Sequence, residues 1–166
     1  MIKKLLVMAV VALPFFASAQ TFKLGLVDTN AVIAGMPETT EANNKLQESQ
    51  KKYQAEFQRI EEEFQKQYEE FRNMKDDELP AIKERKATQL QETQQKAEAF
   101  QQKVMEDLQK QQDELMAPVI QKVRNAIESV GKENGFTYIQ EIVNALYFSA
   151  PVEDITPLVK KKLGIK

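Results

Sequence analysis

The side chains that could carry out chemistry are almost all carboxylates and amines. The chain holds 25 Asp and Glu and 23 Lys and Arg among 166 residues, with no His, no Cys and no Trp. It therefore lacks the commonest general base, the thiolate nucleophile and the usual zinc ligands. It also has no Gly-rich phosphate loop, no G-x-S-x-G and no clustered Asp pattern of a calcium loop. We predict a protein that is not an enzyme and needs no cofactor or metal.

The chemistry that remains is weak apolar binding. Methionine is flexible and polarizable, so it fits many partners weakly, and large apolar groups beside a helical packing stripe can act in the same way. The candidates for contact with a binding partner are Tyr68, Met74, Leu79, Ile82 and Met105. For any single one of them, the simpler interpretation is an ordinary surface residue or a neighbour of the stripe.

Long helices must position these side chains. From Pro37 to residue 134 the chain contains one Gly and two further Pro, and Glu, Gln, Lys and Ala dominate it, a composition that favours helix. Apolar residues recur there at steps of three and four, the pattern of a coiled-coil seam that faces another helix. Polar Gln67 and Thr93 fall on the same steps. The predicted seam residues are Leu46, Tyr53, Phe57, Ile60, Phe64, Phe71, Leu90, Phe100, Val104, Leu108 and Leu115.

A break between two helical arms is expected near Pro80. Proline cannot donate a backbone hydrogen bond and disfavours helix at the residue before it, and Asp76 and Asp77 suit a turn. We predict an antiparallel helical hairpin over 37–117 with its tip near 76–82, each arm about 60 Å long. One continuous kinked helix is the alternative.

The two ends of the mature chain are expected to build one small body, from 20–36 and 118–166. Residues 22–28, 136–140 and 145–149 look like strands, and Thr156 should cap a short terminal helix with Pro157 in its first turn. So small a core is marginal alone, and short strands leave edges that need partners. We therefore predict that several copies share one body, with the hairpins projecting from it.

The N-terminus has the pattern of a secretory signal. Lys3 and Lys4 precede an apolar run that is too short to span a bilayer comfortably, and small residues at 17–19 suit a cleavage site. We predict cleavage after Ala19, with an uncleaved anchor helix as the alternative. Loss of the two lysines makes a chain of net charge −2 more acidic, so nucleic acid is not an expected partner.

Several of these stretches together resemble the Skp/OmpH family of periplasmic chaperones. They are the cleaved signal, a strand within KLGLVDTNAVI, Pro37-Glu38 opening a long hairpin rich in Gln, Glu and Lys, the return into NGFTYIQ, and the closing EDITPLVKKKL. Their order along the mature chain is more specific than any one of them.

The resemblance implies a mainly helical α+β fold and a jellyfish-like homotrimer, with a small β-containing body and three helical tentacles around a cavity. It further implies a periplasmic chaperone that works without ATP and holds unfolded outer-membrane proteins for delivery to the outer membrane. The five candidate contact residues would then touch these clients. The best-known members are strongly basic, whereas this chain is acidic. Its charge gives no support to contact with lipopolysaccharide or membrane.

Two other functions remain open. An exported structural or adaptor coiled coil would use the arms as spacers that dock one folded partner. A membrane-surface role would use the basic run of Lys160, Lys161 and Lys162, which more simply forms a solvated face that complements the helix dipole.

Overall fold

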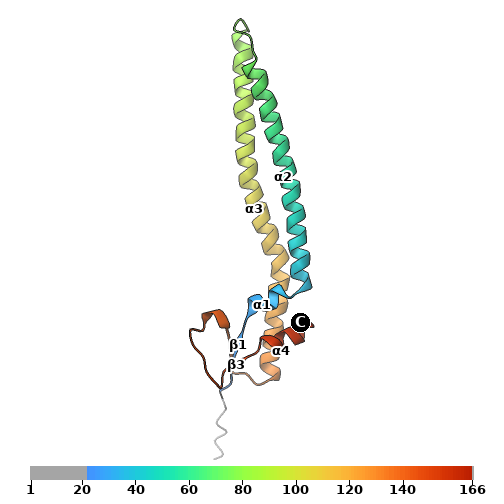
Figure 1. The fold of residues 1–166 in the computed structure, drawn as a ribbon, viewed down its shortest axis with the longest axis vertical. Helices are drawn as coiled ribbons and strands as arrows, with labels where there is room; N and C mark the ends of the chain where they lie inside the picture. The colour runs from blue at the N-terminus through green and yellow to red at the C-terminus, as the bar shows by residue number, and fades with distance from the viewer. Residues whose placement is uncertain (1–21, 166) are drawn as a thin grey trace, which may run out of the picture.

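The computed structural model describes residues 22–165, and the predicted signal segment lies outside them. A long helical hairpin rises from a small body, as the ribbon in Figure 1 shows. The elements in chain order are β1 (Leu24–Val27), α1 (Thr29–Ala34), α2 (Pro37–Arg72), α3 (Pro80–Glu133), β2 (Tyr138–Glu141), the short 3-10 helix η1 (Ile142–Asn144), β3 (Glu153–Asp154) and α4 (Thr156–Leu163).

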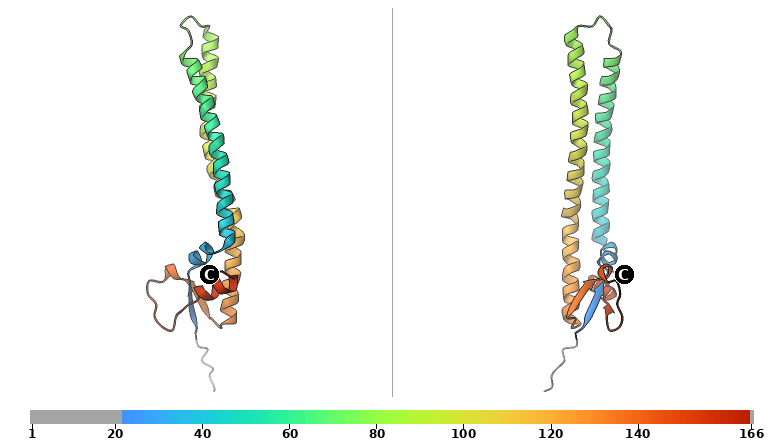
Figure 2. Two further views of the ribbon diagram at one scale, coloured as in Figure 1. Left: turned by 45° about the vertical axis from the view of Figure 1, so that its right-hand side comes forward. Right: turned by 90° about the vertical axis from the view of Figure 1, so that its left-hand side faces the viewer.

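The two arms are single unbroken helices. α2 has 36 residues and α3 has 54, which correspond to about 54 Å and about 80 Å of helix. A proline stands in the first turn of each, where its missing N–H costs nothing. The views in Figure 2 show the arms running side by side in opposite directions. The prediction of an antiparallel hairpin is confirmed, and one continuous kinked helix is excluded.

The loop at the tip spans residues 73–79, somewhat earlier than the expected 76–82. α2 ends at Arg72, and α3 begins at Pro80, so that Ile82 is already helical. The Lys83 amine donates a hydrogen bond to the Asp76 carbonyl across the loop. Pro118 does not interrupt α3, which continues through it into the body. The long helix thus joins tip and body as one element.

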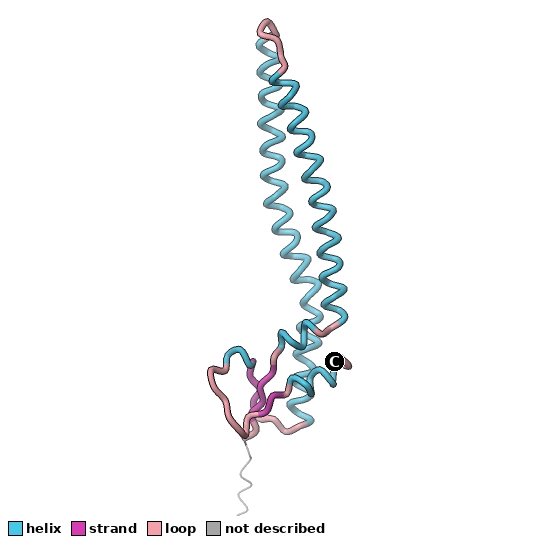
Figure 3. The backbone as a smooth tube through the Cα atoms, viewed as in Figure 1, coloured by secondary structure: helices cyan, strands magenta, loops and turns pink. Residues whose placement is uncertain are grey.

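The body contains a three-stranded parallel sheet in the order β2-β1-β3. α1 and the whole hairpin form the crossover between β1 and its parallel neighbour β2, and Figure 3 shows the strands gathered at the base. The predicted strand over 145–149 is wrong, because those residues lie in the loop before β3. β2 and β3 occupy both edges of β1, so the central strand has no edge left for this segment.

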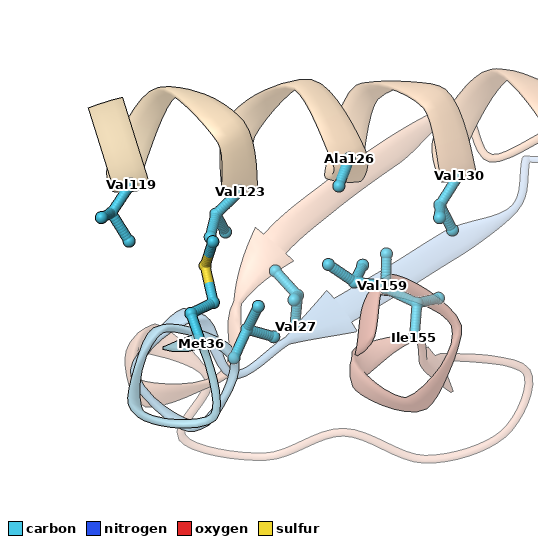
Figure 4. Packing of buried hydrophobic residues seen from close by; sticks show 9 residues of the cluster. Val27, Met36, Val119, Val123, Ala126, Val130, Ile155 and Val159 are labelled. Atoms are coloured by element: carbon cyan, nitrogen blue, oxygen red, sulfur yellow. The ribbon is translucent and has the colours of Figure 1, made fainter. Parts of the chain in front are cut away.

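The core of the body lies where α3 meets the sheet and the terminal helix. Val119, Val123, Ala126 and Val130 form a stripe on α3, and Figure 4 shows it facing residues from the rest of the body. The facing residues include Val27, Val32, Met36, Ile155 and Val159. Because the apolar stripe of α3 continues from the upper seam into this core, hairpin and body share one helix and one packing face.

Thr156 has a role other than the predicted one. It is the first residue of α4, whose N-cap position is held by Ile155. The Thr156 hydroxyl accepts a hydrogen bond from the backbone N–H of Asp28 at 2.9 Å, and Asp154 accepts from the Thr156 N–H at 2.9 Å. The threonine therefore fastens the terminal helix to the turn after β1, while Asp154 satisfies the start of the helix.

Candidate functional site

The hairpin is held together by a narrow seam with few fully buried residues. On α2 Ile60 is 2% exposed, and on α3 Thr93 is 6% exposed. The Thr93 hydroxyl donates a hydrogen bond to the side-chain oxygen of Gln67 at 2.8 Å. Further down, the rings of Tyr53 and Phe100 meet edge to face, with centroids 6.2 Å apart. Aromatic and polar contacts thus alternate along the seam.

Most of the predicted seam residues are partly buried, because a side chain between two helices is covered from one direction only. Apart from the buried Ile60, the exception is Phe71, which lies in the last turn of α2 and is 37% exposed. The partly buried members are Leu46, Tyr53, Phe57, Phe64, Leu90, Phe100, Val104, Leu108 and Leu115.

One side of the hairpin is closed by charged groups. Glu63 pairs with Lys96 at 3.4 Å, and Glu70 pairs with Lys86. The Lys86 hydrogen bond, with its charge, lowers the pKa of the Glu70 carboxyl. Glu63 and Glu70 are seven residues apart, about two helical turns, so they share one side of α2. We call this the ion-paired side.

The opposite side of the seam is open. An apolar groove of about 390 Å³ lies between the arms there, with Tyr53, Phe57, Phe100, Val104 and Met105 in its lining. A second hollow of about 370 Å³ continues from Phe57 along Ile60 and Phe64 toward the tip. We call this the groove side, and the two hollows together the groove.

The five candidate contact residues do not form one cluster. Met105 lines the groove and is 67% exposed, and Tyr68 stacks on Phe64 with ring centroids 6.4 Å apart and is 45% exposed. Leu79, 64% exposed, stands at the tip, where Met74 and Ile82 are half-buried. The structure therefore separates a pair on the groove side from a group of three at the tip.

Comparison with known proteins supplies the family. The family model described as Outer membrane protein (OmpH-like) matches residues 23–163, from β1 to the end of α4. The chain belongs to the OmpH-like family. No curated protein matches it. The family is one of periplasmic chaperones associated with outer-membrane proteins.

The body of this OmpH-like chain carries an exposed apolar surface that the sequence did not single out as a site. Val143, Leu146, Tyr147 and Phe148 lie in or beside the loop after β2, and Leu146 is fully exposed. With Leu24 and neighbouring residues, the last three line a hollow of about 520 Å³. We call this loop the body loop. In the sequence this loop is marked by a run of large apolar residues, which predicted a strand over 145–149 rather than an exposed surface.

The described part of the OmpH-like chain offers no metal-binding cluster and no membrane span. Within residues 22–165 no group of three or more potential ligands among His, Cys, Asp and Glu comes together. None of the helices over that range is long and apolar enough to cross a bilayer.

Three carboxyl groups, those of Glu38, Glu70 and Glu128, have a pKa below the usual 4.5. The largest cause in each case is a hydrogen bond that a lysine donates to the carboxylate. These pairs brace the helices.

Proposed function

We propose that this protein is an ATP-independent periplasmic holdase that keeps unfolded outer-membrane proteins soluble. The observation that carries the proposal is the form of the hairpin: its two arms pack on each other, and above the body no other element in residues 22–165 covers them. Met105 stands exposed beside the seam, and Leu79 stands exposed at the tip. Many such weak contacts, acting together, can hold a long flexible chain firmly.

We further propose that the holdase is a homo-oligomer assembled through its body. The resemblance to the family implies that this oligomer is a trimer. Its core rests on nine buried residues, which is little for independent stability. The body loop exposes Leu146 and Tyr147, with exposed fractions of 104% and 84%. A second copy that covers this loop would bury apolar area and would place several hairpins around one space.

An aggregation assay tests the proposed activity. A denatured outer-membrane β-barrel protein is diluted from urea with the purified mature chain at near-stoichiometric ratio, and light scattering is followed. We expect scattering to be suppressed without any nucleotide. Unchanged scattering, together with saturable capture of one folded partner, would instead support the adaptor function.

Sedimentation equilibrium tests the assembly. We expect a stable oligomer at micromolar concentration and a lower mass for the Leu146→Ser, Tyr147→Ser double variant. Ile120→Ser, at an exposed residue of α3 that lies outside this loop and does not line the hollow, serves as the control. If the wild-type chain were a monomer, there would be no space between several hairpins to hold a client, and the proposed assembly would be wrong.

A further inference from the structure

The groove has the length of a short extended peptide. On α2 its lining begins at Gln50 and ends at Gln65, a separation of about 22 Å at ~1.5 Å per residue. An extended chain advances ~3.3 Å per residue, so about seven residues would fill it. Its two hollows share Phe57, and one segment can therefore occupy both.

The floor of the groove is apolar. In its larger hollow the rings of Tyr53, Phe57 and Phe100 stand beside Val104 and Met105. Met105 is 67% exposed, so its flexible thioether can move to cover an incoming side chain. Apolar side chains from a single face of a partner would gain contact here.

The rim of the groove is made of amides. Of its polar lining residues, Glu61 is the one carboxylate, and the others are glutamines: Gln50, Gln54, Gln65, Gln94 and Gln101. An amide side chain offers a donor and an acceptor without net charge, which matches the exposed backbone of an extended chain. A helix uses its backbone groups internally and would leave this rim without partners.

Other occupants fit the rim less well. A phosphate-bearing ligand would need cations, and the lining of both hollows contains none. A second hairpin packed face to face would bring the Glu61 carboxylates of both copies to the same interface. In the adjoining hollow Glu62 and Glu69 stand beside Glu61, with Lys66 as the one cation among three carboxylates. Like charges at one interface are unfavourable.

We infer that the groove side of each hairpin binds one extended segment of about seven residues in which apolar and polar side chains alternate. This inference rests on the proposed holdase function and specifies which part of a client is recognised. Alternation places the apolar side chains on one face of the segment, against the floor, and the backbone between the amides of the rim. Strands of outer-membrane barrels have this alternation, whereas a segment with its apolar residues in one block does not.

The absence of cysteine from the chain allows a label at a single position. Met105→Cys places an environment-sensitive fluorophore in the groove. Ala99→Cys is the matched control, because Ala99 is exposed and does not line the groove. Six residues turn a helix by about 240°, so the two labels face different sides of α3. Both are introduced into the full mature chain.

Two nine-residue peptides serve as probes. The first has Val, Leu or Phe at every second position, with Ser, Thr or Asn between, and the second has the same composition with its apolar residues in one block. We expect the alternating peptide to shift the fluorescence of the label at 105 and to leave the label at 99 unchanged. Its affinity should exceed that of the blocked isomer by about tenfold, because half of the apolar contact is lost when the faces are mixed.

Met105→Glu supplies a second readout, with Ala99→Glu as the control of equal charge. We expect the first variant to bind the alternating peptide about tenfold more weakly and the second to bind it as the wild type does. Equal affinity for both isomers, equal responses of both labels, or unchanged binding by Met105→Glu would overturn the inference. A response to protein concentration alone by the label at 105, without one by the label at 99, would show a second copy in the groove, which would also overturn it.

The aggregation assay separates this inference from the proposed function. If the wild type keeps the barrel protein soluble but fails these peptide tests, the groove inference falls and the holdase stands. If the wild type binds the alternating peptide in the groove yet leaves aggregation unchanged, the holdase falls and the groove remains a peptide site.

Discussion

The hairpin and the body are stabilised in different ways. In the body, Val32 from α1 is completely buried together with Ile155 and Val159 from the far end of the sequence. Along the hairpin most seam residues are half-buried, and each contact repeats along two regular helices. The body therefore depends on a few irreplaceable residues, whereas the hairpin spreads its stability over many small contacts. A structure of the second kind can keep much apolar surface accessible to a partner without losing its fold.

The largest effect is expected from Ile155→Ala in the body. Ile155 is completely buried, and its backbone N–H bonds the Leu26 carbonyl at 2.8 Å. Removing the side chain leaves a cavity, and we expect a loss of about 2–5 kcal/mol, measured by urea denaturation. Leu158→Ala, three residues further along and 38% exposed, should cost much less. Equal costs would mean that the body is not held by this core.

A smaller effect is expected from Ile60→Ala in the hairpin. Ile60 is 2% exposed, but its neighbours along the seam are only half-buried and can close in partly. We expect a loss of about 2 kcal/mol, seen as a lower thermal midpoint of the helical circular dichroism signal. Tyr68→Ala removes a partly exposed ring that stacks on Phe64 and should cost about 0.5 kcal/mol. A larger loss for Tyr68→Ala than for Ile60→Ala would contradict the assignment of Ile60 to the packed seam.

A polar contact in the same seam allows a double-mutant test. Thr93→Val removes the hydrogen bond to Gln67 and leaves the amide with less to bond, so we expect a loss of about 1 kcal/mol. Adding Gln67→Leu replaces both partners by apolar groups and should recover most of it. Denaturation of the two single variants and the double variant measures the coupling. Additive losses would mean that the contact contributes nothing.

The two regions also differ in how far the sequence predicts them. The hairpin follows from local rules: prolines mark the start of each arm, and a period of three and four residues marks the face that packs. The loop at the tip begins a few residues before its predicted position, because Asp76 and Asp77 lie in the middle of the loop rather than at its start.

The body follows from long-range contacts that local patterns do not encode. The segment 145–149 has the composition of a strand, yet the short polar pair Glu153–Asp154 takes the free edge of β1. Thr156 looks like a helix cap, and its hydroxyl instead accepts from Asp28, which is 128 residues away in the chain. The groove also could not be predicted from the sequence. Most residues of its floor are seam positions, and which side of the seam stays open depends on how the two arms face each other.

The smallest effect concerns pH and the ion-paired side. Lys86 holds the pKa of Glu70 below its usual value of 4.5, and Lys122 does the same for Glu38. A carboxyl whose folded pKa is depressed adds stability above its unfolded pKa and loses it as the pH falls through the folded value. We expect the thermal midpoint to fall between pH 5 and pH 3, more in the wild type than in Glu70→Gln. Because Glu70 is exposed, the difference should be small and should shrink further in high salt. An equal fall in both proteins would show that other carboxylates govern the acid response, and that the ion-paired side owes its closure to packing rather than to charge.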